Sequence, residues 1–281
     1  LGDVYKRQFH KSLNKKMKAV MRYLGGKNRY AREIIEHFPP HCCYLEPCGG
    51  SAGVMLNKPL SAVEIYNDLD GEVVNFFRVL RHGKAGKLID AIRLTPYSRE
   101  ELNHARPVKD PVERARRFLV RSWFGIANDA FRDASSGFRV SRNRQPTVAA
   151  DWKNLPETLE KAVERLRNVY IEQRDALELI KLHDGPETLH FIDPPYLKST
   201  RTREGSYTHE FTDTQHQDLL RLVLDCRGKV VLCGYDNALY NSALSGWCKV
   251  SYGARAGMGK KRVECLWMNY PDQLSLFNFH A

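Results

Sequence analysis

"LHFIDPPYLKS" (residues 189–199) begins like a core strand and ends in a turn with unusual chemistry. Its first four residues are mostly apolar, and Asp193, Pro194, Pro195 and Tyr196 follow them. The two prolines cannot continue a helix or donate main-chain hydrogen bonds, so they hold the turn rigid while their carbonyls remain acceptors. A carboxylate and a prolyl carbonyl beside a flat ring suit the exocyclic amino group of a planar heterocycle.

An ordinary strand-terminating turn with an exposed tyrosine is the alternative interpretation. From average composition, this tetrapeptide is expected by chance only about once in a thousand chains of this length. Its position directly after an apolar strand makes a chance occurrence rarer still. We therefore interpret the turn as a binding site for an amino group.

Similar apolar runs recur along the chain, and most are continuous rather than alternating, as in a sheet that is covered on both faces. Helical patterns over 70–83 and 212–228 separate several of them. This alternation predicts an α/β protein with a doubly wound, mainly parallel sheet. The predicted strands are 42–47, 60–67, 169–173, 189–193, 229–235 and 263–270.

The middle of the chain, residues 94–160, breaks this rhythm and predicts an inserted, largely helical and basic subdomain. It contains one helical run (110–129) and a loop rich in Gly, Ser and Arg (132–146). Between Arg114 and Pro146, eight arginines stand against two aspartates, a local net charge of +6 within a chain of net charge +11. Arginine suits planar contacts with phosphate and guanine, so we expect this insert to contact nucleic acid, although basic stripes are often just solvated faces.

The remaining composition limits the class of protein. With 281 residues, 42% of them apolar, the chain can form one sizeable core in an α/β domain made of 17–93 and 161–281. No apolar run reaches the roughly 18 residues that a membrane span needs. The seven cysteines include no CxxC pair, which favours reduced thiols in a cytoplasmic protein over a zinc site or disulfides. Residues 1–16 read as a non-native or disordered leader, with Met17 or Met21 as the natural start.

A glycine cluster in "YLEPCGGSAGV" (44–54) predicts a ligand loop at the end of the first strand. Gly49, Gly50 and Gly53 let a ligand approach the main chain closely. The cluster is neither a dinucleotide fingerprint nor a P-loop, and a tight turn alone stays open as the alternative.

Two further positions belong with this loop. Asp68, just past the second strand, is placed to accept hydrogen bonds from ribose, although Asp68 or Asp70 could equally cap the next helix. Lys27, in "RYLGGKNR" (22–29), could meet a phosphate or a carboxylate.

These motifs together carry a family resemblance. "RYLGGK", "YLEPCGGSAGV", "YNDLD" and "FIDPPY", in this order and with a basic insert before the last, resemble the Dam-type (group alpha) DNA adenine methyltransferases. The likeness extends through 207–223, 232–247 and 263–270, so it covers almost everything after Met17. It implies a Rossmann-like fold, S-adenosylmethionine as cofactor and double-stranded DNA as substrate, with no metal and no membrane.

The resemblance also implies the roles of individual residues. The target adenine is flipped out of the duplex and stacks on Tyr196, while Asp193 and the Pro194 carbonyl accept hydrogen bonds from its 6-amino group. Asp193, Pro194, Pro195 and Tyr196 are thus the catalytic set, and Asp193 contacts the cofactor as well. The other implied cofactor positions are Tyr23, Lys27, Glu46, Pro47, Gly49, Gly50, Gly53, Asp68 and, by a weaker match, Asp175.

The insert is expected to recognise the target sequence. The arginines assigned to DNA contact are Arg121, Arg132, Arg139, Arg142 and Arg144. Arg139 stands where relatives that read GATC have Asn, so the sequence does not support a GATC target. We expect the protein to be a monomer. The sequence leaves open whether it acts with a cognate restriction endonuclease, belongs to a phage or is an orphan regulator. Methylation of the cytosine 4-amino group and a catalytically silent DNA-binding protein are the alternative functions.

Overall fold

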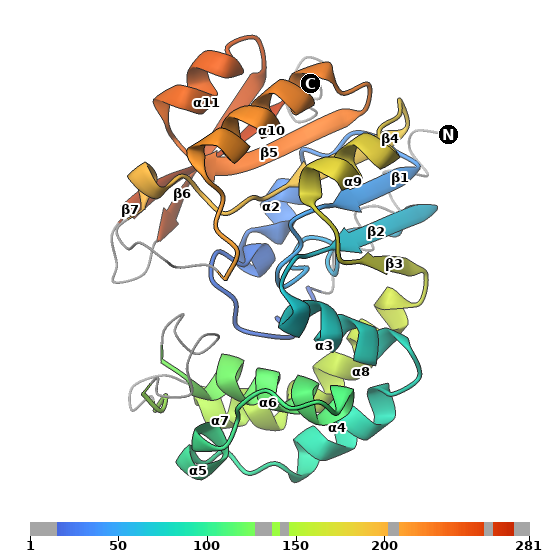
Figure 1. Cartoon of the computed structure of the whole chain (residues 1–281), viewed down its shortest axis with the longest axis vertical. Helices are drawn as coiled ribbons and strands as arrows, with labels where there is room; N and C mark the ends of the chain where they lie inside the picture. The colour runs from blue at the N-terminus through green and yellow to red at the C-terminus, as the bar shows by residue number, and fades with distance from the viewer. Residues whose placement is uncertain (1–15, 127–136, 141–145, 202–207, 256–260, 273–281) are drawn as a thin grey trace, which may run out of the picture.

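The computed structural model describes residues 16–126, 137–140, 146–201, 208–255 and 261–272. It consists of a twisted sheet with helices on both faces and a separate layer of helices packed against one end (Figure 1). All of the predicted leader except Lys16 lies outside the described residues. No helix in the described ranges is both long enough and apolar enough to cross a membrane.

The sheet has seven strands in the order β3-β2-β1-β4-β5-β7-β6. The first five of these run parallel, whereas β7 is antiparallel to both β5 and β6. The prediction of a doubly wound, mainly parallel α/β sheet is therefore confirmed. The strands are β1 (Cys43–Glu46), β2 (Val63–Asn67), β3 (Val169–Glu172), β4 (Thr188–Ile192), β5 (Lys229–Tyr235), β6 (Cys248–Arg255) and β7 (Lys261–Met268).

The sequence did not predict β6, and its position explains why. It lies at the edge of the sheet and pairs only with β7. From Cys248 to Gly253 its residues alternate between half-buried and exposed. This period-2 pattern lacks the continuous apolar run by which the inner strands were recognised.

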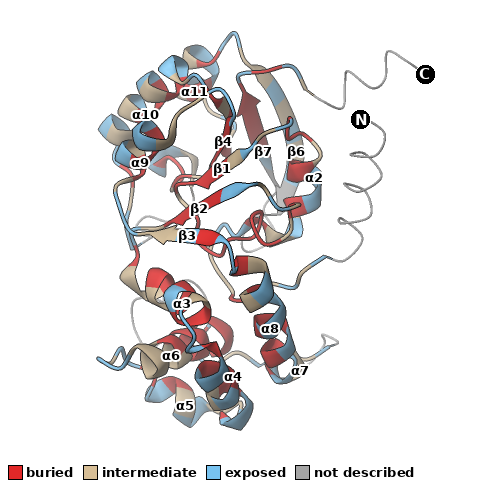
Figure 2. Cartoon of the chain, turned by 90° about the vertical axis from the view of Figure 1, so that its right-hand side faces the viewer, coloured by how far each residue is buried: buried red, intermediate tan, exposed pale blue. Residues whose placement is uncertain are grey.

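Alternating residues of each inner strand face two separate cores. Tyr44, on one face, packs with the helices α2 (Ala31–Ile35) and α3 (Gly71–Arg81). The neighbouring Leu45 faces the other way, toward α9 (Ala176–His183), α10 (Asp213–Asp225) and α11 (Ala238–Ala243). Both faces of the sheet are thus buried, which accounts for the continuously apolar strands (Figure 2).

The layer beneath β3 is entirely helical in the described residues (Figures 1 and 2). Its longest helix, α6, has Asp110 as N-cap, Pro111 in its first turn and Gly125 at its C-terminal end, so it is shorter than the predicted run of 110–129. The predicted insert of 94–160 starts at the end of α4, which itself packs against α6 and α8. The helices are α4 (Ala85–Leu94), α5 (Arg99–Asn103), α6 (Pro111–Phe124), α7 (Val148–Lys153) and α8 (Leu155–Leu166).

Candidate active site

A cleft opens where the strand order reverses, at the carboxyl ends of β1 and β4. Ligands in open α/β sheets bind at this kind of position, because the connections leave β1 and β4 in opposite directions. The cleft has about 770 Å³ of empty space, including the part open to solvent. Its lining comes from residues 23–27, most of 46–53, 68–70, Ala176, 193–195 and the segment 208–211.

The glycine loop after β1 forms one wall of the cleft, and the neighbouring residues leave no room for side chains at its glycines. A Cβ on Gly49 would lie 2.1 Å from the ring of Tyr66. Gly50 has a φ of +48°, and a Cβ there would lie 2.7 Å from the ring of Tyr23. At Gly53 a Cβ would lie 2.5 Å from the main-chain nitrogen of Asn28. The loop thus lies flat against its neighbours and exposes main chain to the cleft.

The acids after β2 divide the two roles that the sequence left open. Asp70 caps α3 by accepting a hydrogen bond from the Glu72 N–H at 2.8 Å. Asp68 instead lines the cleft and accepts from the N–H groups of Gly50 and Asp70, both at 2.8 Å. Burial raises the pKa of Asp68 to about 6, so at neutral pH it is an ionised acceptor.

Glu46 and Pro47 close the floor of the cleft beneath the loop. Glu46 is 3% exposed, and its carboxyl accepts from the Tyr44 hydroxyl at 3.1 Å and the Met55 N–H at 3.2 Å. Burial raises the pKa of Glu46 to about 8. The Pro47 carbonyl accepts from the side chain of Asn67 at 2.8 Å, which ties β1 to β2.

Lys27 meets a carboxylate, one of the two partners that the sequence allowed. Its ammonium donates to both carboxylate oxygens of Asp193 at 2.8 Å and to the carbonyl of Gly25 at 3.0 Å. Glu264 Oε2 lies 3.8 Å away. Burial alone would lower the pKa of Lys27, but Asp193 and Glu264 raise it above its usual range. Lys27 is therefore a buried cation held between two acids.

The turn after β4 brings the four predicted catalytic residues to the same edge of the sheet. Asp193, Pro194 and Pro195 line the cleft, whereas Tyr196 lies behind them and is 6% exposed. The Tyr196 hydroxyl donates to Glu264 Oε2 at 2.6 Å. The Lys27 ammonium lies 4.9 Å from the centre of the Tyr196 ring.

The structure leaves the predicted Asp175 outside the lining of the cleft and brings Glu264, which was not predicted, close to Lys27. Asp175 is the N-cap of α9, where its carboxylate accepts from the N–H groups of Leu177 at 2.9 Å and Glu178 at 3.1 Å, and it does not line the cleft. The sequence reasoning also missed Glu264, which is 7% exposed. An acid inside the apolar strand "VECLWM" was the signal that could have identified it.

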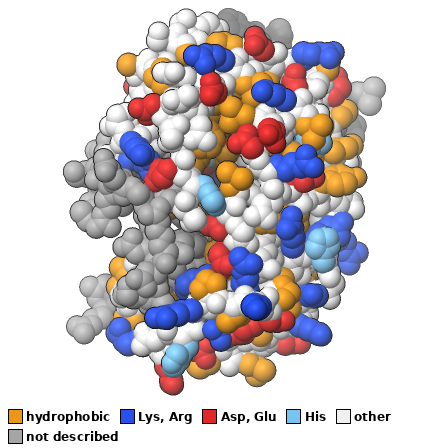
Figure 3. Space-filling model, viewed as in Figure 1, with side chains coloured by type: hydrophobic (Ala, Val, Ile, Leu, Met, Phe, Trp, Pro, Cys, Tyr) orange, Lys and Arg blue, Asp and Glu red, His pale blue; other side chains and the backbone are white. Residues whose placement is uncertain are grey.

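The arginines of α6 form ion pairs within the protein. Arg121 was predicted to contact DNA, but the residue is 2% exposed and its guanidinium donates to Glu72 at 2.5 Å and to the carbonyl of Ala105, so the structure does not support this contact. Arg114 pairs with Glu72 as well, and Arg116 and Arg117 pair with Glu113. Figure 3 shows basic and acidic side chains intermingled over this layer.

Arg139 is the one predicted DNA contact within the described residues that stays a candidate. It is half-buried, and its Nε donates to the carbonyl of Gly125 at 3.0 Å. The other predicted contacts, Arg132, Arg142 and Arg144, lie outside the described residues.

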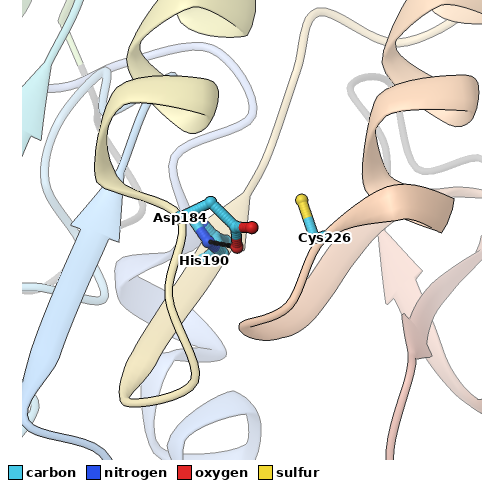
Figure 4. Close-up of side chains that lie close together, drawn as sticks. All are labelled: Asp184, His190 and Cys226. Atoms are coloured by element: carbon cyan, nitrogen blue, oxygen red, sulfur yellow. Dashed lines mark hydrogen bonds and ion pairs between the residues drawn. The ribbon is translucent and has the colours of Figure 1, made fainter.

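A second cluster of titratable groups lies away from the cleft (Figure 4). Asp184, His190 and Cys226 offer three donor types that bind metals, but Asp184, the Nε2 atom of His190 and the Cys226 thiol already have partners in the protein. Asp184 accepts from His190 at 3.2 Å and from the N–H groups of Arg227 and Gly228, both at 2.9 Å. The Cys226 thiol donates to the carbonyl of Leu222 at 3.4 Å. The cluster therefore braces the turn that precedes β5.

Comparison with known proteins identifies a family and two named relatives. The family model of the D12 class N6 adenine-specific DNA methyltransferases matches residues 23–252. A DNA adenine methylase of Salmonella typhi is 25% identical, over 92% of this chain and 97% of its own length. One of Escherichia coli (strain K12) is 24% identical, over 93% and 98%. A solved SAM-dependent methyltransferase of Agrobacterium tumefaciens aligns at 10% identity with a TM-score of 0.35, covering 86% of this chain and 61% of that one.

Proposed function

The chain belongs to the D12 class N6 adenine-specific DNA methyltransferases, and on that premise we propose how its cleft carries out the reaction. The protein is a DNA adenine methyltransferase that uses S-adenosylmethionine as methyl donor. One observation carries the proposal. The rigid acceptor turn of Asp193 and Pro194 lies on the same cleft as the glycine loop, so a methyl donor and an amino group can meet there.

The residues of the cleft fit the cofactor, which supplies the reactive methyl group when bound. The glycine loop packs closely against Tyr23, Tyr66 and the main chain of Asn28, where added Cβ atoms would clash and force the loop to shift. We propose that Asp68 accepts a hydrogen bond from a ribose hydroxyl and that the Tyr23 ring, packed against Gly50, forms the adjoining wall. Glu46 and Pro47 hold the loop from below.

We propose that the acceptor turn binds the 6-amino group of an adenine flipped out of the duplex. Asp193 and the Pro194 carbonyl accept its two hydrogens, and the Tyr196 ring supports the base. The hydrogen bonds draw the nitrogen lone pair out of conjugation and aim it at the methyl group. Asp193 is an anion, so it also stabilises the positive charge that develops on the nitrogen during transfer.

We assign recognition of the DNA sequence to the helical insert of 94–160. Arg139, next to the end of α6, is the described candidate for a DNA contact, and Arg132, Arg142 and Arg144 belong to the same proposal. The ion pairs of α6 support a different role for that helix, a rigid platform for the loops that follow it. The target sequence stays unassigned.

We further propose that the enzyme works as a monomer in the bacterial cytoplasm, since one chain supplies every described wall of the cleft. Light scattering of the purified protein tests the monomer. A cognate restriction endonuclease for the same site is the protein partner we propose, and resistance of methylated DNA to endonucleases from the same source tests it.

A methyl transfer assay tests the proposed function. Unmethylated duplex DNA of varied sequence is incubated with the protein and tritium-labelled S-adenosylmethionine, and the DNA is then digested to nucleosides. Label in N6-methyladenine is the expected result. Label in N4-methylcytosine would instead support the cytosine alternative, and DNA binding without any transfer would support a silent DNA-binding protein.

A further inference from the structure

Lys27 occupies the place that the target adenine must take. Its ammonium binds both oxygens of Asp193 at 2.8 Å and lies 4.9 Å from the centre of the Tyr196 ring. The acceptor atom and the ring proposed to hold the base are therefore both covered by the same cation. The amino group cannot bind in this arrangement unless Lys27 moves.

The ion pair also opposes the chemistry. Attack by the adenine nitrogen places positive charge on it, and the negative charge of Asp193 stabilises that charge only while it is not neutralised by another cation. Moving a buried ammonium away from its counter-ion is costly unless a second anion receives it. A second anion must therefore lie close to the Lys27 ammonium.

Glu264 has the required position. Its Oε2 lies 3.8 Å from the Lys27 nitrogen, so a shift of the ammonium by about one ångström would turn this ion pair into a direct hydrogen bond. Among the residues whose side chains the structure describes, Lys27 is the one cation within ion-pair distance of Glu264. Building on the proposed function of Asp193, we propose that Glu264 is a positioning residue that takes the Lys27 ammonium from Asp193 when the target amino group binds.

The surroundings of Glu264 hold its carboxylate ready for this exchange. On β7 it is paired with Tyr235 of β5 and Tyr252 of β6. The ring of Tyr235 packs edge-on against Tyr196, with centroids 4.7 Å apart. The Tyr196 hydroxyl donates to the same Oε2 atom at 2.6 Å. The Oε2 atom of Glu264, which is the proposed acceptor for Lys27, is thus also bound to Tyr196, whose ring is proposed to support the base.

Glu264→Gln tests this inference, because the amide keeps an acceptor for Tyr196 but has no charge to attract Lys27. We expect kcat at saturating DNA and cofactor to fall by about tenfold or more, while the Kd for S-adenosylmethionine from calorimetry changes by less than about threefold. Glu178→Gln, an exposed position on α9, is the matched control and should leave both quantities unchanged. A kcat within about twofold of wild type would overturn the inference.

A second pair of variants separates charge from shape. If Glu264 served only the Tyr196 hydroxyl, Glu264→Gln would not lower kcat further in a Tyr196→Phe background. We expect it to lower kcat there by the same factor as in the wild type.

Glu264→Asp keeps the charge and should retain more activity than Glu264→Gln, provided that both variants bind cofactor. Equal losses of activity would refute the exchange. If Glu264→Gln does not fold, Glu264→Asp decides: because it keeps the charge, its kcat should stay within about threefold of wild type, and a loss of about tenfold or more would overturn the inference.

Failure of this inference is distinguishable from failure of the proposed function. Transfer that persists in Asp193→Ala, or no transfer by the wild type, would remove the proposed function. An inactive Asp193→Ala beside a fully active Glu264→Gln would remove only the role of Glu264.

Discussion

The cleft and the helix α6 both concentrate charged residues, yet they use them in opposite ways. In the cleft, Asp68 and Asp193 end at a surface that a ligand can reach. In α6, Arg116 and Arg121 are bound by acids of neighbouring helices, Glu101 of α5 and Glu72 of α3. Charge directed at a cleft favours chemistry, whereas charge that is paired between helices favours stability. Substitutions in the two regions should therefore have different consequences, and four predictions test this difference.

The largest effect is expected at Asp193. Asp193→Ala removes the acceptor for the amino group, so the single-turnover rate of methyl transfer should fall by about a thousandfold or more. Circular dichroism and thermal unfolding should show that the variant still folds. Asp218→Ala, a partly exposed position on α10 with a carboxylate in a surface ion pair, is the control and should keep the wild-type rate. Near-normal turnover in Asp193→Ala would contradict the distinction between a cleft that carries out chemistry and a helix α6 that provides stability.

The next effect is expected in the stability of the helical layer. Arg121→Ala removes the buried partner of the partly buried Glu72 carboxylate, and we expect the free energy of unfolding to fall by about 3 kcal/mol. Arg167→Ala, which breaks an exposed pair on the same layer, should change it by less than about 0.5 kcal/mol. Urea denaturation measures both. Equal changes in the two variants would show that burial of the Arg121–Glu72 pair adds nothing to the stability of the protein.

A smaller effect is expected where main chain meets cofactor. Gly49→Ala would place a methyl group 2.1 Å from the Tyr66 ring, so the loop must shift. We expect the affinity for S-adenosylmethionine to fall by about tenfold, as measured by calorimetry. Gly86→Ala, on α4 with nothing within 4 Å of the added atom, is the control and should bind cofactor normally. Unchanged affinity in Gly49→Ala would show that the tight loop does not shape the cofactor site.

The smallest effect concerns pH and Glu46. Burial raises the pKa of this carboxyl to about 8 in the folded protein, from 4.5 ordinarily. Between these values the folded state binds more protons than the unfolded state, so stability falls as pH rises through this window. Glu46→Gln removes this term, and the wild type should lose about 1 kcal/mol or more relative to the variant between pH 5 and 8. The free energies of unfolding of both proteins are measured by urea denaturation at several pH values. If they change with pH in the same way, the raised pKa of Glu46 is contradicted.

The same contrast explains what could be predicted from the sequence. The turn of Asp193 and the loop around Gly49 were predictable because proline and glycine restrict the main chain locally, so a short motif determines the geometry. The role of Arg121 was not predictable, since its partner Glu72 lies on another helix. Glu264 was missed for the same reason, because its contacts with Tyr196 and Lys27 exist only after distant strands have paired. The edge strand β6 was missed because its residues alternate, whereas the inner strands were recognised by their continuous apolar runs.

Single-turnover methyl transfer by Asp193→Ala and Arg121→Ala, measured side by side at a temperature where both are folded and with cofactor and DNA saturating, tests the central claim most directly. We predict that Arg121→Ala transfers at close to the wild-type rate, whereas Asp193→Ala is slower by about a thousandfold or more. Comparable rates in the two variants, or a larger loss in Arg121→Ala, would contradict the account.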